Sequence, residues 1–371
     1  MNFYLNLNKI VGSFLILFLF NIFFIGRALA ADNIPLDFKI SQMIMMGFHG
    51  TESKDYEASK LLNYAKTGEI GGILILKYNI KDKKQITGLI KSFKNAENPQ
   101  YPLLIAIDQE GGQVQRLNQS NGFKNYPSAK QISESMSPDK AKQIYLDMAE
   151  SLKDTGINFN LAPVVDLDIN PDSPAIGKKQ RSFSNDPNKV VLFAEKFIDA
   201  HREKKVLTSL KHFPGHGSAL SDSHLGFTDV TDTWQNKELL PYFELIKRGK
   251  ADSIMSSHIF NRNIDDRLPA SLSQKHIQQI LREKLGYNGV IITDDLQMAA
   301  ISNNYSFKDT VINAINAGND ILLFSNYFKP DINIPVKVKK IVLKAVKEGK
   351  IKRERIEESF SRITQLKESG F

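Results

Sequence analysis

The chain has 371 residues, of which 42% are hydrophobic and 24% charged, and its formal net charge is +8. This balance excludes a collagen-like, a largely disordered or a polytopic membrane protein, and the length fits two average domains or one large α/β barrel. The absence of cysteine excludes disulfides, thiolate zinc sites, iron–sulfur clusters and a cysteine nucleophile. The positive residues are spread along the chain, which predicts a modest attraction to anionic surfaces and no nucleic-acid binding.

Residues 1–30 have the pattern of a secretory signal peptide. Lys9 precedes an apolar run at 10–25, and Ala28-Leu29-Ala30 supplies the small residues that a signal peptidase recognises. We expect removal after Ala30 or Ala31, and a periplasmic mature chain without a stable membrane anchor. The alternative is an uncleaved anchor, although the run is shorter than the roughly 20 residues of a membrane span. No cysteine follows the run, which excludes a lipoprotein anchor.

Short apolar runs recur through the rest of the chain. They are apolar nearly throughout, as expected for parallel strands covered on both faces. The runs lie at residues 43–48, 72–76, 103–107, 159–163, 207–212, 253–257, 290–293 and 320–324. Amphipathic stretches of helical periodicity lie between them, at residues 83–95, 140–155, 187–204, 235–247 and 273–285.

Eight strands, nearly all followed by a helix, predict a (β/α)8 barrel of the TIM type. The alternative is a doubly wound open sheet, but no G-x-G-x-x-G turn follows the first strand. The Lys- and Arg-rich stretch 331–368 predicts two amphipathic helices with a solvated basic face, or else a contact with an anionic partner. We therefore expect residues 31–371 to form one catalytic barrel with C-terminal helices.

Ionisable residues stand at the ends of five of the predicted strands. Charges at strand ends must be solvated or paired, and reactive groups of a barrel gather where strands end. This pattern therefore predicts an active site at that edge of the barrel. The residues are Asp108, Asp166, Lys211 with His212, His258, and Asp294.

The segment 211–224 contains three histidines and is the densest of these patches. His212 and His216 are four apart, but Pro214 lies between them and would break the helix that such a metal pair requires. We therefore predict no metal site. We expect polar contacts with a hydroxyl-rich substrate and one catalytic imidazole.

Asp222-Ser223-His224 supplies that imidazole. A carboxylate two residues before a histidine can accept its N–H and fix its tautomer, which leaves the other nitrogen to exchange a proton. A serine hydrolase is disfavoured because no G-x-S-x-G elbow is present. Asp294 ends an apolar strand, where its carboxylate could attack an anomeric carbon. Asp295 competes for that role, since successive side chains point in different directions.

Four segments resemble glycoside hydrolase family 3, in particular its single-domain β-N-acetylglucosaminidases. Ile107-Asp108-Gln109-Glu110-Gly111-Gly112-Gln113-Val114-Gln115-Arg116 resembles the substrate-binding segment of the family, with Gln113 where a basic residue is common. Lys211-His212-Phe213-Pro214-Gly215-His216-Gly217, followed by Asp222-Ser223-His224, is similar to its most diagnostic signature. Thr293-Asp294-Asp295-Leu296-Gln297-Met298 is similar to its nucleophile strand, and Pro269-Ala270-Ser271-Leu272-Ser273 is a supporting match.

The resemblance implies a two-step retaining mechanism without a cofactor. It implies Asp294 as nucleophile and His224 as general acid/base, assisted by Asp222. The substrate would be a carbohydrate with a terminal N-acetylglucosamine, from cell-wall fragments or chitin oligosaccharides. The implied sugar-binding residues are Asp108, Arg116, Arg181, Lys211 and His212.

Three alternatives remain open at this point. A family 3 β-glucosidase or β-xylosidase usually has a second domain that supplies a glutamate as acid/base. A phosphorylase is the second alternative, because neutral histidine does not repel an anionic acceptor and phosphate could therefore replace water. A catalytically inactive sugar-binding protein would have lost the three catalytic residues, which are present here.

Overall fold

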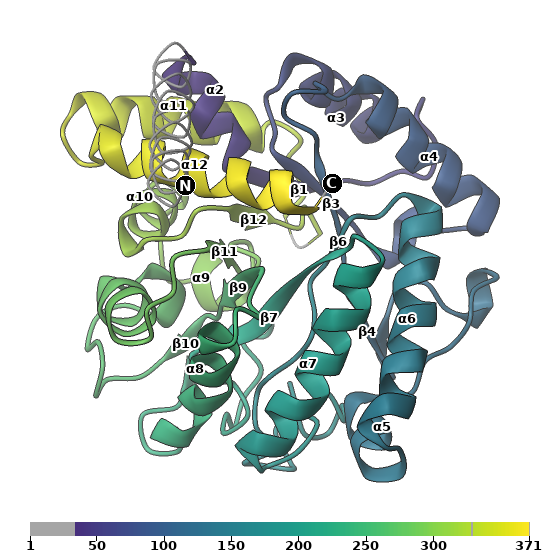
Figure 1. Cartoon of the computed structure of the whole chain (residues 1–371). Coiled ribbons are helices and arrows are strands. Elements are labelled where there is room, and N and C mark those ends of the chain that lie inside the picture. The colour runs from purple at the N-terminus through teal and green to yellow at the C-terminus, as the bar shows by residue number, and fades with distance from the viewer. Residues whose placement is uncertain (1–33, 328, 371) are drawn as a thin grey trace, which may run out of the picture.

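Eight parallel strands stand at the centre of the structure, which is a computed structural model describing residues 34–327 and 329–370 (Figure 1). The predicted signal peptide, residues 1–30, lies outside the described residues. The strands are neighbours in the order β11-β9-β7-β6-β3-β2-β1-β12. They are β1 (Ile44–Gly47), β2 (Gly72–Ile75), β3 (Leu104–Ile107), β6 (Phe159–Asn160), β7 (Leu207–Phe213), β9 (Ser253–Ser256), β11 (Val290–Thr293) and β12 (Leu322–Phe324). Each overlaps a predicted strand, and the predicted barrel fold is confirmed.

The ring of strands closes between β11 and β12. Ile292 and Ile321 form a parallel bridge there, and the backbone N–H of Thr293 donates to the carbonyl of Ile321 at 2.9 Å. Every residue of β1, β2, β3 and β11 is buried. The strands are therefore apolar on both faces because one face fills the barrel and the other lies under the helices.

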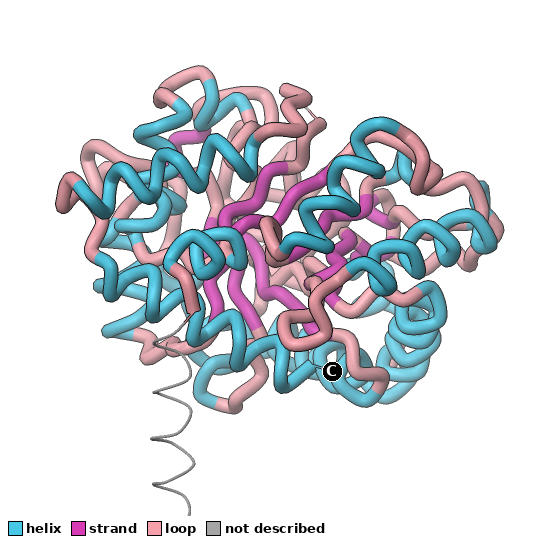
Figure 2. Tube along the Cα trace, turned by 90° about the horizontal axis from the view of Figure 1, so that it is seen from above, coloured by secondary structure: helices cyan, strands magenta, loops and turns pink. Residues whose placement is uncertain are grey.

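Helices surround the strands on all sides (Figure 2). They are α2 (Leu36–Gln42), α3 (Tyr56–Thr67), α4 (Lys83–Ala96), α5 (Ala129–Ser135), α6 (Pro138–Thr155), α7 (Pro187–Glu203), α8 (Leu240–Lys247), α9 (Ala299–Ser302), α10 (Phe307–Ala317), α11 (Ile334–Lys347) and α12 (Arg353–Gly370). The two helices predicted in 331–368 are confirmed as α11 and α12. Within the part of the chain that the structure describes, no helix combines the length and apolarity of a membrane span.

Two predicted helices differ in form from the expectation. The stretch predicted at 235–247 is divided into a 3₁₀ turn, Asn236–Leu239, and α8. Pro241 lies in the first turn of α8, where its missing N–H costs nothing, and this placement fixes the start of the α-helix. The stretch predicted at 273–285 is a π-helix, Lys275–Lys284. Its periodicity indicates a helix but does not distinguish the two helix types.

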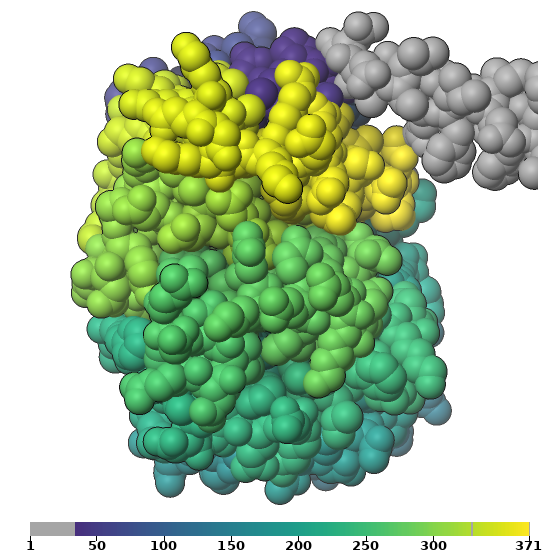
Figure 3. Space-filling view, turned by 90° about the vertical axis from the view of Figure 1, so that its left-hand side faces the viewer, coloured from purple at the N-terminus to yellow at the C-terminus, as the bar shows by residue number. Residues whose placement is uncertain are grey.

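The first and last described helices pack together (Figure 3). Buried Lys39 of α2 pairs with Glu357 of α12, and Lys367 of α12 donates to the side-chain oxygen of Gln42 at 2.9 Å. The elements that begin and end the described chain therefore support each other.

A buried carboxylate secures the junction between β11, β12 and α12. Asp320 is fully buried, and its oxygens accept from Arg282 at 2.7 Å and from Arg355 at 2.5 Å. It also accepts the backbone N–H of Ile291 at 3.0 Å, which ties it to the neighbouring strand. Because the charge is buried and compensated, removing it would take from buried Arg282 the carboxylate with which it pairs.

We predict that Asp320→Asn lowers the free energy of unfolding by about 3–5 kcal/mol, the usual cost of breaking a buried ion pair. Chemical denaturation followed by circular dichroism measures this change. Asp139→Asn is the matched control, because Asp139 pairs with Lys196 at the surface with a 90% exposed side chain. Equal stability of Asp320→Asn and the control would contradict the structural role.

Candidate active site

A cavity of about 460 Å³ opens where the strands end. Its size is within the range of small-ligand sites, and its position agrees with the rule that barrels react at the C-terminal ends of their strands. Of the eight predicted site residues, all but Asp222 line it. They are Asp108, Arg116, Arg181, Lys211, His212, His224 and Asp294.

A short hairpin carries the first of these groups. The strands β4 (Gln109–Gly111) and β5 (Val114–Gln115) pair directly after β3. Gly111, the last residue of β4, and Gly112, which follows it, have φ of 98° and 59°, and a side chain on Gly111 would collide with a carbonyl 2.3 Å away. Glycine is therefore required here, because only it adopts this conformation without strain or collision. The hairpin returns the chain so that Arg116 lies beside Asp108.

Asp108 is held between two cations. Its oxygens accept from Nζ of Lys211 at 2.9 Å and from Arg116 at 3.0 Å. Burial alone would raise the pKa of Asp108, but the charges of Lys211 and Arg116 outweigh it and hold the pKa well below its usual value. The carboxylate is therefore ionised and suited to accept hydrogen bonds from sugar hydroxyls.

Glu110 belongs to the same cluster, although we assigned it no role from the sequence. Its carboxylate accepts two hydrogen bonds from Arg181, at 2.8 and 2.7 Å, and lies 2.7 Å from Nζ of Lys211. Burial opposes ionisation, but these two cations lower the pKa of Glu110 to about 2. In the sequence, the D-x-E spacing after the third strand is the feature that points to a role for Glu110. Its partner Arg181 is too far along the chain for the pairing to be predicted.

His212 is oriented by a second buried carboxylate, that of Asp166. Nδ1 of His212 lies 2.6 Å from Asp166, and Nε2 lies 3.2 Å from a guanidinium nitrogen of Arg181. Because Arg181 can only donate, Nε2 accepts and Nδ1 carries the proton that Asp166 accepts. Asp166 also accepts the backbone N–H of His216 at 2.8 Å. Within the described residues, no three His, Asp or Glu side chains are placed to hold a metal ion.

His224 and Asp222 form the pair that the sequence predicts. Oδ1 of Asp222 lies 2.7 Å from Nδ1 of His224 and accepts the backbone N–H of His224 at 3.1 Å. Burial lowers the pKa of His224, but the hydrogen bond to Asp222 and the charge of Asp294 outweigh it, so that the pKa is raised. Since Nδ1 faces Asp222, proton exchange with a substrate would take place at Nε2.

The environments of Asp294 and Asp295 distinguish the two carboxylates. Asp295 accepts hydrogen bonds from the backbone and hydroxyl of Ser325, at 2.9 and 2.5 Å, and burial raises its pKa to about 6. Asp294 accepts one hydrogen bond, from the backbone N–H of Asp295 at 2.8 Å. Burial would raise its pKa too, but His258, His212 and His224 together lower it. The structure thus favours Asp294 as the ionised carboxylate.

Other side chains at the wall of the cavity had no role in the sequence analysis. Tyr78 and Tyr327 lie in the loops after β2 and β12, and their rings stack with centroids 5.9 Å apart. Gln113, the departure from the family pattern, and Lys179 also line the cavity. Single aromatic or polar residues in loops leave no pattern from which to predict such positions.

Comparisons with known proteins agree with this geometry. The model of the glycosyl hydrolase family 3 N-terminal domain matches residues 35–366. The chain belongs to glycoside hydrolase family 3. It is 38% identical over 290 residues to a β-hexosaminidase of Tolumonas auensis, covering 76% of this chain and 82% of that protein. It is 34% identical to β-hexosaminidase A of Pseudoalteromonas piscicida, covering 81% of this chain and about half (53%) of that protein.

Solved structures of the family are similar as well. A family 3 β-N-acetylglucosaminidase of Paenibacillus sp. str. FPU-7 superposes with a TM-score of 0.82 at 32% identity, covering 91% of this chain and 62% of that one. A β-N-acetylhexosaminidase of Beutenbergia cavernae gives a TM-score of 0.81 at 26% identity, covering 91% of this chain and 99% of that one. The predicted family, barrel fold and enzyme class, a glycoside hydrolase, are confirmed.

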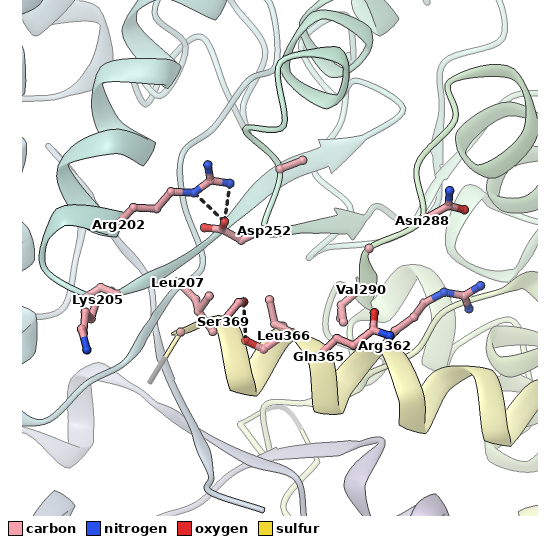
Figure 4. Close-up of a pocket in the computed structure, with 14 residues that line it drawn as sticks. Arg202, Lys205, Leu207, Asp252, Asn288, Val290, Arg362, Gln365, Leu366 and Ser369 are labelled. Carbon is pink, nitrogen blue, oxygen red and sulfur yellow. Dashed lines mark hydrogen bonds and ion pairs between the residues drawn. The ribbon is translucent and has the colours of Figure 1, made fainter. Parts of the chain in front are cut away.

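A second cavity of this family 3 chain lies at the N-terminal ends of the strands, and Figure 4 shows the residues that line it. It measures about 430 Å³ and is lined by Leu207 and Val290, which stand at the first residues of β7 and β11. Arg202 points across it to the carboxylate of Asp252, 2.6 Å away. Active sites of such barrels lie at the C-terminal ends of the strands, so the first cavity, and not this one, has the position of a reaction site.

We predict that Glu110→Gln lowers the free energy of unfolding by about 3 kcal/mol at pH 7, because Arg181 and Lys211 lose a buried counter-charge. The pKa of Glu110 falls from an ordinary 4.5 to about 2 on folding, so this contribution is complete above pH 4.5. It is lost as the pH falls toward 2. Unfolding of both proteins between pH 2 and pH 7 measures the difference. A pH-independent difference would contradict the assignment.

Proposed function

We propose that the chain is an exo-acting, retaining β-N-acetylglucosaminidase that hydrolyses terminal non-reducing N-acetylglucosamine. One observation carries the proposal: Asp294, at the end of β11, and His224, in the loop after β7, line the same cavity. A retaining glycosidase needs a nucleophile and an acid/base group on opposite sides of the bond that it cleaves. The names of the β-hexosaminidase relatives support the hexosamine substrate over a glucoside or xyloside.

In the first step Asp294 attacks the anomeric carbon C1. A bond forms between its carboxylate oxygen and C1, while the bond from C1 to the leaving oxygen breaks and its electron pair stays on that oxygen. Protonated His224 gives its Nε2 proton to the leaving oxygen. The lowered pKa of Asp294 and the raised pKa of His224 place both groups in the required protonation states.

In the second step water replaces the aspartate. Neutral His224 accepts a proton from water at Nε2, the water oxygen bonds to C1, and the Asp294 carboxylate leaves. Asp222 accepts the Nδ1 proton of His224 throughout, which stabilises the imidazolium in each half of the cycle. Two inversions at C1 retain the configuration of the sugar.

The glycone is held in this proposal by the cluster around Lys211. Asp108 accepts hydrogen bonds from sugar hydroxyls, and Arg116, Lys211 and His212 offer further polar contacts at the wall of the cavity. Arg181 binds Glu110 with two nitrogens and lies against Nε2 of His212, so it orders the cluster. We propose cell-wall fragments or chitin oligosaccharides as substrates, and the periplasm as the location.

Replacement of the proposed nucleophile tests the reaction. We predict that Asp294→Ala lowers the hydrolysis of a nitrophenyl N-acetylglucosaminide at least about 1,000-fold, because no covalent intermediate can form. Binding of N-acetylglucosamine, measured by calorimetry, should persist. Asp168→Asn, whose side chain pairs with Lys130 outside the cavity lining, is the control. Undiminished hydrolysis by Asp294→Ala would show that the nucleophile is misassigned.

The pH dependence tests the acid/base pair. Protonated His224 is the active form in the first step, so kcat/KM falls as the pH rises through its pKa. Asp222 raises that pKa, and Asp222→Asn should therefore move the basic limb of the profile to lower pH, by about one unit. Exposed Asp229→Asn is the control and should leave the limb in place. A limb that does not move in Asp222→Asn would disprove the pairing.

A further inference from the structure

Lys179 lies at the wall of the cavity but has no part in the reaction described above. Its ammonium Nζ donates to Oδ2 of Asp222 at 3.2 Å. The other oxygen of that carboxylate, Oδ1, faces the ring and backbone nitrogens of His224. Asp222 is therefore shared between the acid/base group and a lysine from a different loop.

The backbone around Lys179 is firmly held. The N–H of Gln180 donates to the carbonyl of Gly177 at 2.8 Å, and its side-chain oxygen accepts from Ser128 at 3.1 Å. The next residue is Arg181, which is fixed by its two hydrogen bonds to Glu110. Lys179 therefore projects from a loop that is anchored on its C-terminal side to the sugar-binding cluster.

The loop that carries His224 is anchored less densely. Leu220 and Leu225, which flank the catalytic pair, are 70% and 84% exposed. Between them, the hydroxyl of Ser223 lies 3.2 Å from Nε2 of buried His216 and connects this loop to the barrel. The Asp222 side chain is only 9% exposed, so without Lys179 its Oδ2 atom would lose a charged partner in a place that water reaches poorly.

We propose that Lys179 is a positioning residue for the acid/base pair. By holding Oδ2, it fixes the plane of the Asp222 carboxylate, which in turn fixes the orientation of the His224 ring toward the leaving oxygen. Lys179 thus links the loop that binds the sugar to the loop that donates the proton. The inference rests on the proposed function, since it concerns His224 as the general acid.

A comparison of leaving groups separates this role from general support of the fold. A 2,4-dinitrophenolate leaves without protonation, whereas the sugar alcohol released from N,N′-diacetylchitobiose must be protonated as it leaves. We expect Lys179→Met to lower kcat/KM at least about 10-fold on the disaccharide and less than about twofold on 2,4-dinitrophenyl N-acetylglucosaminide, because only the former depends on the acid. The parameter kcat/KM reports the first step, in which His224 acts as acid.

Two variants serve as controls. Lys179→Arg keeps a cation within reach of Asp222 and should restore at least half of the lost activity on the disaccharide. Lys178→Met removes the preceding, exposed lysine of the same loop and should leave both substrates unaffected. Should Lys179→Met fail to fold by circular dichroism, Lys179→Gln is compared on the same two substrates.

Equal losses on the two substrates, or no loss on either, would overturn the positioning role. Failure of the wild-type enzyme to hydrolyse any N-acetylglucosaminide would instead overturn the proposed function. The two failures are therefore distinguishable.

Discussion

A buried lysine is the centre on which the arrangement of the site depends. The side chain of Lys211 is 2% exposed, and an ammonium in such a place requires compensation. Asp108, directly after β3, and Glu110, in the hairpin strand β4, provide it. Burial would lower the pKa of Lys211, but the two carboxylates outweigh burial and raise it. Arg116 and Arg181 then balance the two carboxylates. This cluster is therefore an alternating set of charges in which each member fixes its neighbours.

The two adjacent aspartates at the end of β11 differ in another way, because their surroundings shift their pKa values in opposite directions. Histidines around Asp294 favour its anion, whereas Asp295 is buried against Ser325 and has a raised pKa. In the proposed function Asp294 is the nucleophile, whereas Asp295 connects β11 to the loop after β12 through its hydrogen bonds to Ser325. Separation of pKa values between neighbours of one residue type is a common means of assigning roles within a site.

The sequence predicts the eight strands well because strands buried on both faces must be apolar nearly throughout. It also predicts the ionisable residues at the strand ends, because charges at these positions must be solvated or paired. Pairings between side chains that are distant in the chain could not be predicted from the sequence. Nothing near Glu110 indicates Arg181, and nothing near Asp222 indicates Lys179, because each contact exists only once the barrel brings two loops together. The π-helix at Lys275–Lys284 could be predicted only as a helix, because a stretch of 10 residues has too few turns for its apolar positions to distinguish i→i+5 from i→i+4 bonding.

The pairing of β1 with β12, and of α2 with α12, has a consequence for biosynthesis. β1 can pair with β2 early, but its other neighbour, β12, is translated last, so closure of the ring is a late event of high contact order. The core of the barrel is therefore incomplete until translation of the chain is nearly finished. Until then the backbone edges of β1 and β11 that β12 covers stay unpaired, and such open edges invite pairing with other chains.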